Sequence, residues 1–441
     1  MRHSTSAARG GAHFWIALLA FAFVATGVNT AGAQGAIAQA DTSYSGSNRW
    51  VATWGGAPIP PGETTTIDAL FSNNHSQSFD NQTVRNIAHV SVGGRRVRVR
   101  LSNAFGMLPL RVGSAHVALS RGGATINTAT GRRLTFGGQV SVLIPAGGVV
   151  LSDAVDLTVP SASELAVSVY LPGQTEPATF NETKMQTSYV AAAGSGNLVN
   201  AADLPSASPT RSTFYVTAIE VLPAESVGAL VAFGDSVTLG AGSTPELNRS
   251  WPDQLSVRLN GWRPRLSVVN QGIGCNRLLY DMCGQSGAAR FDRDVLGVTG
   301  VSHVIVAFGI NDLMIPSILP NFGYPEFASE TASAAEIIFG LQQIAQRAKA
   351  AGLKVYGATI TPNGSSPAPG AHTPETEAKR TAVNRWIRAS GAFDGVVDFD
   401  AAVRDPANPT RLLPAYDADG VHLTDAGYGA MANAVNLSML F

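Results

Sequence analysis

The sequence lacks the features that identify nucleic-acid-binding, membrane-spanning and cofactor-dependent proteins. Its 30 basic and 31 acidic residues leave a formal charge of −1, which gives a phosphate backbone no basic surface to bind. Beyond the N-terminal region, no run is apolar enough to cross a bilayer. The motifs G-x-S-x-G, H-E-x-x-H and G-x-x-x-x-G-K-[ST] do not occur. We therefore expect no nucleic-acid partner, no integral membrane association and no metal or nucleotide cofactor.

The first 33 residues have the pattern of a secretory signal peptide. Arg2 and Arg9 give a positive start, residues 14–28 are apolar, and Ala31-Gly32-Ala33 offers small residues for cleavage. A membrane anchor is the alternative, but about 15 apolar residues are few for a span that needs about 20. We expect a signal peptide at 1–33 and a secreted or periplasmic mature protein.

Cysteine is scarce as well, since only Cys275 and Cys283 occur. In an exported chain a pair this close is more typical of a disulfide than of a metal site, which would need further ligands. Two buried free thiols are the alternative. A bridge over so short a loop adds modest entropic stability, so its expected role is to fix the local loop.

Residues 226–441 alternate between strand and helix patterns. Short β-rich runs without period-two alternation suit strands that are buried on both faces. These runs lie at 231–233, 266–269, 304–308, 355–359 and 396–399. Helical stretches with capping signals fill the gaps, as at Ser333 with Glu336 and at Thr373 with Pro374. The alternation predicts an α/β domain in which helices cover a parallel sheet.

Residues 45–225 carry short alternating runs broken by turn residues, with almost no helical periodicity. Residues 88–92, the turn Gly93-Gly94 and residues 95–101 predict a hairpin, and similar runs lie at 164–171 and 213–222. An all-β, sandwich-like domain is the most economical interpretation. The boundary with the second domain is expected near residue 225.

Two features of this first half allow a functional or a structural interpretation. The alternation from Arg96 to Arg100 is typical of a strand with one polar face, so a solvated edge is favoured over a site for an acidic polymer. Trp50 and Trp54 are typical either of packing at a domain seam, which we favour, or of stacking on sugars.

The second half contains the residue types of a serine nucleophile and its base. Ser236 lies in Phe233-Gly234-Asp235-Ser236, and Asp419-Gly420-Val421-His422 places a carboxylate three residues before a histidine. A serine hydroxyl needs an imidazole within hydrogen-bond reach and a carboxylate that fixes the imidazole tautomer. A glycine N–H at Gly272 and the amide of Asn311, each after an apolar run, are candidates to hold a developing oxyanion.

Together these segments resemble the SGNH (GDSL-type) hydrolases, whose four blocks carry Ser, Gly, Asn and His in that order. The blocks correspond to Ser236, Gly272, Asn311 and His422, with Asp419 as the acid of D-x-x-H. The resemblance covers about 226–441, roughly half of the chain, and four blocks in order are far more specific than one. One departure exists, because the first block reads GDSV and not GDSL.

The resemblance implies a flavodoxin-like three-layer fold for 226–441 and a catalytic triad of Ser236, Asp419 and His422. It also implies an oxyanion hole formed by Ser236, Gly272 and Asn311. The other histidines of this half are weaker candidates for the base. His303 lies at the start of a strand that is expected to be buried, and His372 either lines the cleft or is solvated in its loop. The side chains of the consecutive residues Asp235 and Ser236 are expected to point in different directions. Asp235 is therefore interpreted as a residue that fixes the loop.

We therefore expect an exported serine esterase that acts on small-molecule or carbohydrate esters, with short-chain acyl or O-acetyl groups favoured. Lipase or lysophospholipase activity is the alternative within the same family. From a different class, the chain could be a carbohydrate-binding protein with a vestigial SGNH domain, although the intact set of site residues argues against this.

Overall fold

The computed structural model describes residues 49–62, 77–182, 185–262 and 265–441. The predicted signal peptide at 1–33 lies outside these residues. Gly46–Phe441 forms one compact unit. Within the described residues, no helix is both long and apolar enough to cross a membrane. The predicted division near residue 225 corresponds to a change from antiparallel strands to alternating strands and helices, and it stays a prediction as a boundary between domains.

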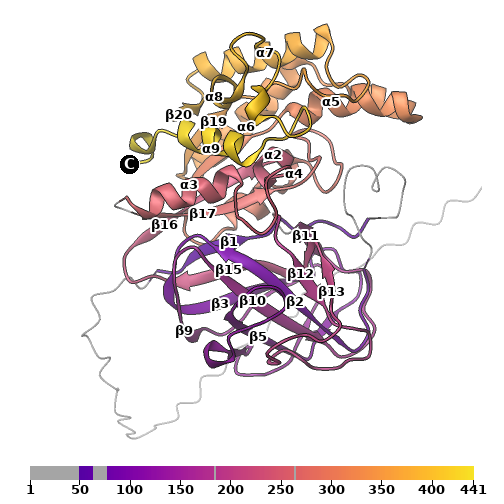
Figure 1. Cartoon of the computed structure of the whole chain (residues 1–441), viewed down its shortest axis with the longest axis vertical. Helices are drawn as coiled ribbons and strands as arrows, with labels where there is room; N and C mark the ends of the chain where they lie inside the picture. The colour runs from indigo at the N-terminus through magenta and orange to yellow at the C-terminus, as the bar shows by residue number, and fades with distance from the viewer. Residues whose placement is uncertain (1–48, 63–76, 183–184, 263–264) are drawn as a thin grey trace, which may run out of the picture. The chain divides into compact units, whose positions relative to one another are not determined.

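The first part consists of antiparallel strands in two main sheets (Figure 1). One sheet has the order β1 (Val51–Gly55), β15 (Val216–Leu222), β3 (Gly94–Ser102), β8 (Val149–Leu151), and β9 (Val155–Val159) also pairs with β3. The other has the order β13 (Ser208–Thr210), β12 (Ser188–Val190), β2 (Gln82–Val90), β10 (Ser163–Leu171), β5 (Ser114–Leu119), β6 (Arg132–Leu134). The described residues of this part also contain two small pairs: β11 (Phe180–Glu182) with β14 (Ser212–Phe214), and β4 (Leu110–Val112) with β7 (Val142–Ile144).

The predicted hairpin at 88–101 is wrong. The two strands exist, but β2 pairs with β10 and β12, whereas β3 pairs with β15, β8 and β9 in the other sheet. The turn at Gly93-Gly94 therefore passes the chain between sheets. A local turn pattern does not specify which strand will pair with which, because pairing is decided by burial of the two apolar faces.

The prediction of a solvated edge for the arginine run is also wrong, because β3 is paired on both sides. Arg98 and Arg100 form ion pairs with Glu220 of β15, whose side chain is fully buried. Arg98 also lies over the ring of Trp50, with its guanidinium carbon 4.4 Å from the ring centroid. Trp54 is buried, as expected for packing at a seam.

The second part contains the five predicted strands in one parallel sheet. Its order is β17 (Arg265–Gly272), β16 (Val227–Gly234), β18 (Val301–Ala307), β19 (Lys354–Ala358), β20 (Gly395–Val397). The helices are α2 (Ser236–Leu239), α3 (Trp251–Asn260), α4 (Gly287–Phe291), α5 (Ile310–Ile318), α6 (Ala334–Ala350), α7 (Pro374–Ala389), α8 (Phe399–Val403) and α9 (Asp425–Ala434). The predicted capping boxes are present at Ser333 and Thr373.

Alternate residues of the parallel strands lie in two separate apolar cores. Leu230 and Ala232 of β16 belong to a core shared with α3, α8 and α9. Val231 and Phe233 belong to a second core shared with α6 and α7. Because both faces are covered, the strands are apolar throughout, which explains why the sequence showed no alternation there.

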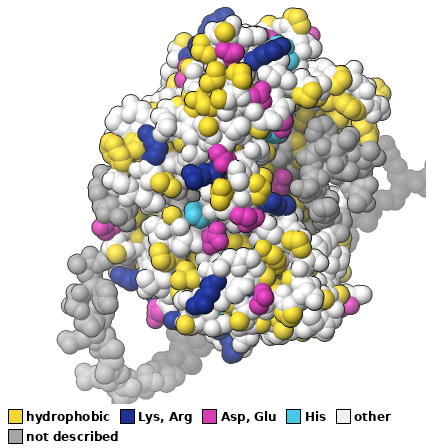
Figure 2. All heavy atoms as spheres, viewed as in Figure 1, with side chains coloured by type: hydrophobic (Ala, Val, Ile, Leu, Met, Phe, Trp, Pro, Cys, Tyr) yellow, Lys and Arg dark blue, Asp and Glu magenta, His cyan; other side chains and the backbone are white. Residues whose placement is uncertain are grey.

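The second core continues into the antiparallel sheets, so the two parts share one apolar interior. Polar bonds cross the same seam: the N–H of Ala52 donates to Thr299 O at 2.9 Å, and Ser267 Oγ donates to Ala52 O at 2.6 Å. Ser91 Oγ accepts the N–H of Val268 at 3.1 Å. On the face drawn in Figure 2, acidic and basic side chains are interspersed, in keeping with the near-zero formal charge.

Candidate active site

Ser236 lies where β16 ends and α2 begins, and it is the first residue of that helix. Asp235 is the N-cap of α2, and its Oδ1 accepts the N–H of Val237 at 3.0 Å. Complete burial raises the pKa of Asp235 to about 7, although the Val237 N–H favours the charged carboxylate. Asp235 therefore fixes the turn that presents Ser236, as the sequence indicated.

The structure brings Ser236, His422 and Asp419 into one chain of hydrogen bonds. His422 Nε2 lies 2.9 Å from Ser236 Oγ, and His422 Nδ1 lies 2.7 Å from Asp419 Oδ2. Asp419 Oδ1 also accepts the N–H groups of Val421 and His422, at 3.0 and 2.8 Å. The carboxylate thus holds both the ring and the backbone of the histidine.

The Asp419 carboxylate stays ionised well into the acid range. Partial burial opposes its ionisation, but hydrogen bonds and charge from His422, with the Val421 N–H, hold the pKa of Asp419 below its ordinary value. An ionised carboxylate accepts a hydrogen bond from Nδ1–H, which leaves Nε2 free to accept a proton from Ser236.

Asn311 lies in the first turn of α5, which begins after β18 and the N-cap Gly309. Its amide is buried, and Nδ2 donates to Asn276 O at 2.9 Å. An amide nitrogen carries two hydrogens, so one remains for another acceptor. The neighbouring Asp312 accepts the N–H groups of Leu278 and Leu279 at 2.8 and 3.0 Å, and burial raises its pKa.

Gly272 ends β17, but its N–H is already engaged, because it donates to Asn270 Oδ1 at 2.9 Å. Its lack of a side chain has a packing reason. A Cβ at this position would lie 2.3 Å from the backbone nitrogen of Leu239, so α2 could not approach the end of β17. The structure therefore gives Gly272 a role that does not depend on an oxyanion.

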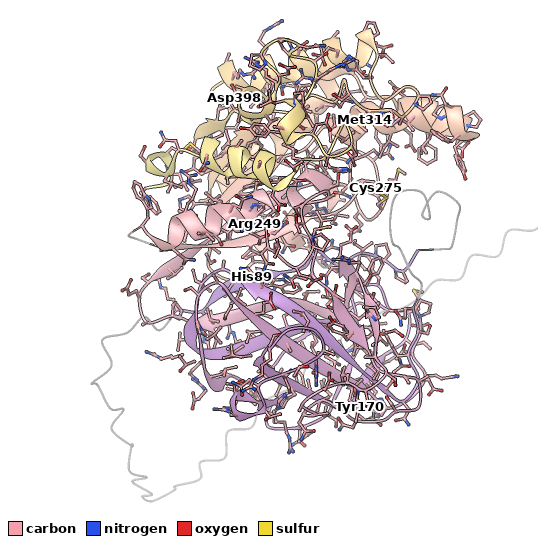
Figure 3. All side chains as sticks on the ribbon, in the orientation of Figure 1. His89, Tyr170, Arg249, Cys275, Met314 and Asp398 are labelled. Atoms are coloured by element: carbon pink, nitrogen blue, oxygen red, sulfur yellow. A yellow bond between two sulfur atoms is a disulfide. The ribbon has the colours of Figure 1, made fainter. Side chains whose placement is uncertain are left out.

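Cys275 and Cys283 form the predicted disulfide. Figure 3 labels Cys275, which lies in the loop between β17 and α4. Both cysteines adopt positive φ, 46° and 51°. The bridge holds the loop that follows Gly272, which is the local role expected for it.

Sequence reasoning missed Arg290, a fully buried residue of α4 that joins the ends of two parallel strands. Its Nη2 donates to Gly234 O at 2.8 Å, and its Nη1 donates to Gln271 O at 2.9 Å. Its Nε donates to Asn276 Oδ1 at 3.0 Å. Burial lowers the pKa of Arg290 to about 10, so the guanidinium keeps its charge at neutral pH. No sequence pattern marks this residue, because its partners come from distant segments.

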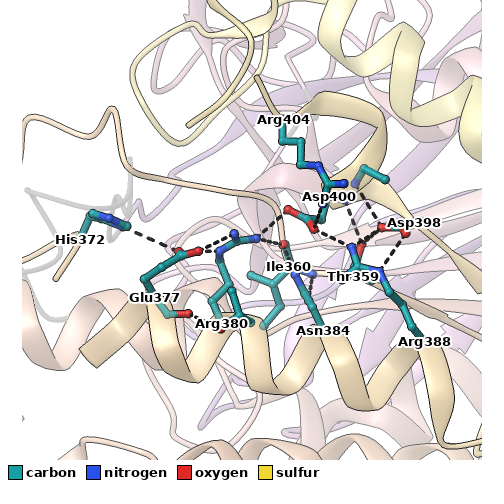
Figure 4. A network of polar contacts seen from close by, with 12 residues as sticks. Thr359, Ile360, His372, Glu377, Arg380, Asn384, Arg388, Asp398, Asp400 and Arg404 are labelled. Atoms are coloured by element: carbon teal, nitrogen blue, oxygen red, sulfur yellow. Dashed lines mark hydrogen bonds and ion pairs between the residues drawn. The ribbon is translucent and has the colours of Figure 1, made fainter. Parts of the chain in front are cut away.

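The other histidines of this half lie elsewhere. His303 of β18 is bonded at both ring nitrogens, to Ser302 Oγ at 2.7 Å and to Leu440 O at 2.9 Å, as expected for a core histidine. His372 faces Glu377 of α7, with Nδ1 3.9 Å from Oε2. Figure 4 shows it at one end of a network centred on Asp400, which pairs with Arg380, Arg388 and Arg404.

Comparison with known proteins finds a family match in the second part of the chain. Residues 232–430 match the model of the GDSL-like Lipase/Acylhydrolase family. No curated protein matches the chain. Solved structures similar to it include a GDSL-like lipase from Bacteroides thetaiotaomicron, with 20% identity over 48% of this chain and 87% of that one and a TM-score of 0.35.

Two further similar structures are esterases. One is a carbohydrate acetylesterase from Sinorhizobium meliloti, with 17% identity over 48% of this chain and all of that one (100%) and a TM-score of 0.37. The other is the aryl esterase of M. smegmatis, with 16% identity, 47% and 96% coverage and a TM-score of 0.36. The assignment rests on the family model. The chain carries a domain of the GDSL-like lipase/acylhydrolase family at residues 232–430, which is consistent with a carboxylic ester hydrolase.

Proposed function

We propose that the protein is a serine esterase in which Ser236 is the nucleophile, His422 the base and Asp419 the residue that orients the base. The observation that carries this proposal is the continuous contact from Ser236 Oγ through the imidazole to the Asp419 carboxylate, at 2.9 and 2.7 Å. Both distances are those of hydrogen bonds, and each ring nitrogen has a different partner.

In this mechanism Ser236 Oγ attacks the ester carbonyl while His422 Nε2 takes its proton. The resulting tetrahedral oxyanion collapses, and the same nitrogen returns the proton to the departing alcohol. Water, activated by His422, then attacks the acyl-enzyme and releases the acid. The ionised Asp419 stabilises the imidazolium that forms twice in each cycle. No cofactor takes part in these steps.

Donors for the oxyanion are proposed at the backbone N–H of Ser236 and at the free amide hydrogen of Asn311. In the described part of the chain, the N–H of Ser236 has no hydrogen-bond acceptor. It could therefore bond the oxyanion of the transition state without first breaking another hydrogen bond. The predicted third donor, the N–H of Gly272, would first have to leave Asn270 Oδ1.

We further propose that the parallel sheet and its helices form the flavodoxin-like three-layer domain of 226–441, that the antiparallel sheets form a sandwich, and that the protein is exported and works outside the cytoplasm. The disulfide supports export, because such bridges persist in oxidising compartments. The substrate is proposed to be a short-chain ester, such as an O-acetyl group on a carbohydrate.

The test is a series of p-nitrophenyl esters of increasing acyl length, hydrolysed by the parent and by Ser236→Ala. The parent should prefer acetate or butyrate, and the variant should lose activity by several orders of magnitude with an unchanged melting temperature. A preference for long chains would favour a lipase-type enzyme. Residual activity above a few per cent in Ser236→Ala would disprove the nucleophile assignment, and an inactive parent would favour a vestigial domain.

A further inference from the structure

Among the described residues, the segment 272–276 at the end of β17 has one backbone N–H group without an acceptor. Successive N–H groups of 272–276 can each be followed to a partner, since buried donors are rarely left unpaired. Gly272 donates to Asn270 Oδ1, Ile273 to Gly234 O, Gly274 to Glu182 Oε2, and Asn276 to Ile273 O. Within the residues that the structure describes, only the Cys275 N–H of the segment 272–276 has no acceptor.

The position of Cys275 suits a donor to the reacting carbonyl. The N–H of Ile273 donates to Gly234 O at 3.3 Å, two residues before Ser236. On the other side, Asn276 O accepts Asn311 Nδ2 at 2.9 Å. Cys275 therefore lies in a loop that is tied at one end to the strand before the nucleophile and at the other to the proposed oxyanion amide. It is 7% exposed, so little water competes for its N–H.

The conformation of Cys275 is imposed by its surroundings. Its φ of 46° is in the left-handed region, which non-glycine residues adopt only at an energetic cost. The disulfide to Cys283 holds its side chain. The preceding residue, Gly274, is held by a residue from the antiparallel part of the chain: Glu182, at the end of β11, accepts the Gly274 N–H at 2.5 Å.

Glu182 fits closely against this loop. A Cβ at Gly274 would lie 2.8 Å from Glu182 Oε1 and 3.1 Å from Oε2, so the carboxylate packs directly over the backbone there. A carboxylate bond to a backbone N–H is charge-assisted and stronger than a neutral one. The antiparallel part of the chain thus has a contact one residue away from the unpaired donor.

From these contacts we infer that the backbone N–H of Cys275 is an oxyanion donor and that Glu182 is the positioning residue that aims it. This inference rests on the proposed function, since it needs an acyl carbonyl at Ser236. It gives the antiparallel region a part in turnover, in place of a detachable substrate-binding role.

The first experiment is a crystal structure of the full chain after reaction with diethyl p-nitrophenyl phosphate, whose phosphoryl oxygen takes the place of the oxyanion. We expect Ser236 to carry the phosphoryl group, with that oxygen within about 3 Å of the Cys275 nitrogen. An oxygen bonded instead to the Gly272 nitrogen, with the Asn270 bond broken, would overturn the inference and leave the esterase proposal standing. Failure to modify Ser236 would overturn both.

The second experiment measures steady-state kinetics of Glu182→Ala and Glu182→Gln with p-nitrophenyl acetate. Misplacing one donor costs up to about 100-fold in rate, so Glu182→Ala should lower kcat by about 10- to 100-fold with KM nearly unchanged. Glu182→Gln keeps a carbonyl acceptor and should recover much of the loss, which a general structural defect would not.

The matched control is Glu176→Gln. Glu176 also belongs to the antiparallel part and also accepts backbone N–H groups, those of Met107 and Leu108 at 2.9 and 2.6 Å. Its replacement should leave kcat unchanged. Equal kcat values for the parent and Glu182→Ala, at equal melting temperature, would refute the positioning role of Glu182.

Discussion

At the scale of single residues, a substitution of Asn311 distinguishes two roles for its side chain, that of an oxyanion donor and that of a purely structural asparagine. Its amide uses one hydrogen to bond Asn276 O and has one left. Removing one oxyanion donor costs about 3 kcal/mol, or about 10²–10³ in rate, mainly in the transition state. Asn311→Ala should therefore depress kcat strongly, with little change in KM or melting temperature.

Asn321→Ala is the control for this prediction. Asn321 follows the same helix and also uses its amide on carbonyl groups, those of Ser317 and Pro369 at 2.8 and 3.1 Å. Its side chain is exposed, so kcat should not change. If Asn311→Ala instead unfolds the protein, or keeps kcat within a few-fold of the parent, the residue only joins α5 to the loop.

The hydrogen-bonded contact of Ser236, His422 and Asp419 could be predicted from the sequence because short motifs fix the spacing and chemistry of these residues. Asp419 precedes His422 by three residues, and the turn alone brings the carboxylate to the ring. Cys275 and Arg290 could not be predicted in this way. A free N–H is recognised only after the acceptors of its neighbours are known, and those acceptors come from β11, β16 and β17.

At the scale of elements, the start of α2 predicts a pH-dependent stability. The pKa of Asp235 is raised to about 7 in the folded chain, above the value near 4 of an unfolded aspartate. Between these values the folded state binds more protons than the unfolded state, so this group lowers stability as pH rises from about 4 to 7.

Asp235→Asn should remove this contribution, because an amide oxygen still accepts the Val237 N–H and carries no charge. The difference in melting temperature between variant and parent should therefore move in favour of the variant as pH rises from 5 to 8. Thermal unfolding across this range measures it. A difference that is constant with pH would show that Asp235 titrates normally.

A second prediction at this scale concerns the loop that the disulfide bridges. It distinguishes the contribution of the Cys275 backbone N–H to kcat from the contribution of the disulfide. Two double variants share Cys283→Ser and therefore both lack the bridge. Glycine adopts positive φ readily and keeps the N–H, whereas β-branched valine does not adopt this conformation without strain. Cys275→Gly/Cys283→Ser should keep kcat within a few-fold, and Cys275→Val/Cys283→Ser should lose about 10-fold or more. Equal losses would show that the bridge itself is required.

Strands could be predicted from the sequence where a local apolar pattern determines them. They could not be predicted where their bounds depend on which strands pair with each other. The five parallel strands are apolar runs that must be buried on both faces, and each was found within a few residues of its predicted range. The run at 213–222 was expected to be continuous, but Tyr215 has a φ of 62° and divides it into β14 and β15 of different sheets. Such a break depends on distant strands.

At the scale of the whole molecule, the change in pattern near residue 225 marks a change of topology without a break in the core. The apolar cluster runs from the antiparallel sheets to α6 and α7, and β1 lies against β17. A fragment that starts at residue 226 should therefore expose part of this cluster and be insoluble or much less stable. A soluble fragment with parent-like kcat on p-nitrophenyl acetate would contradict the shared core and the role of Glu182.

Glu220 provides the sharpest test that the two parts unfold together. Its buried carboxylate pairs with Arg98 and Arg100, and Oε1 accepts the hydroxyl of Thr299 at 2.7 Å from the loop before β18. Arg100 Nη1 also donates to Gly297 O at 2.9 Å. Removing one member of a buried ion pair costs about 3–5 kcal/mol, because the remaining charge is left without compensation.

Glu220→Ala should therefore lower the free energy of unfolding by about 3–5 kcal/mol while the protein still unfolds in a single transition. Urea unfolding gives the free energy, and calorimetry shows whether one transition or two occurs. The control is Asp156→Ala, which removes the exposed ion pair between Asp156 of β9 and Arg96 of β3. This change should lower the free energy of unfolding by about 1 kcal/mol or less. Two separate transitions in the parent, with only the antiparallel part affected by Glu220→Ala, would show that the parts fold independently and that the seam carries little of the stability.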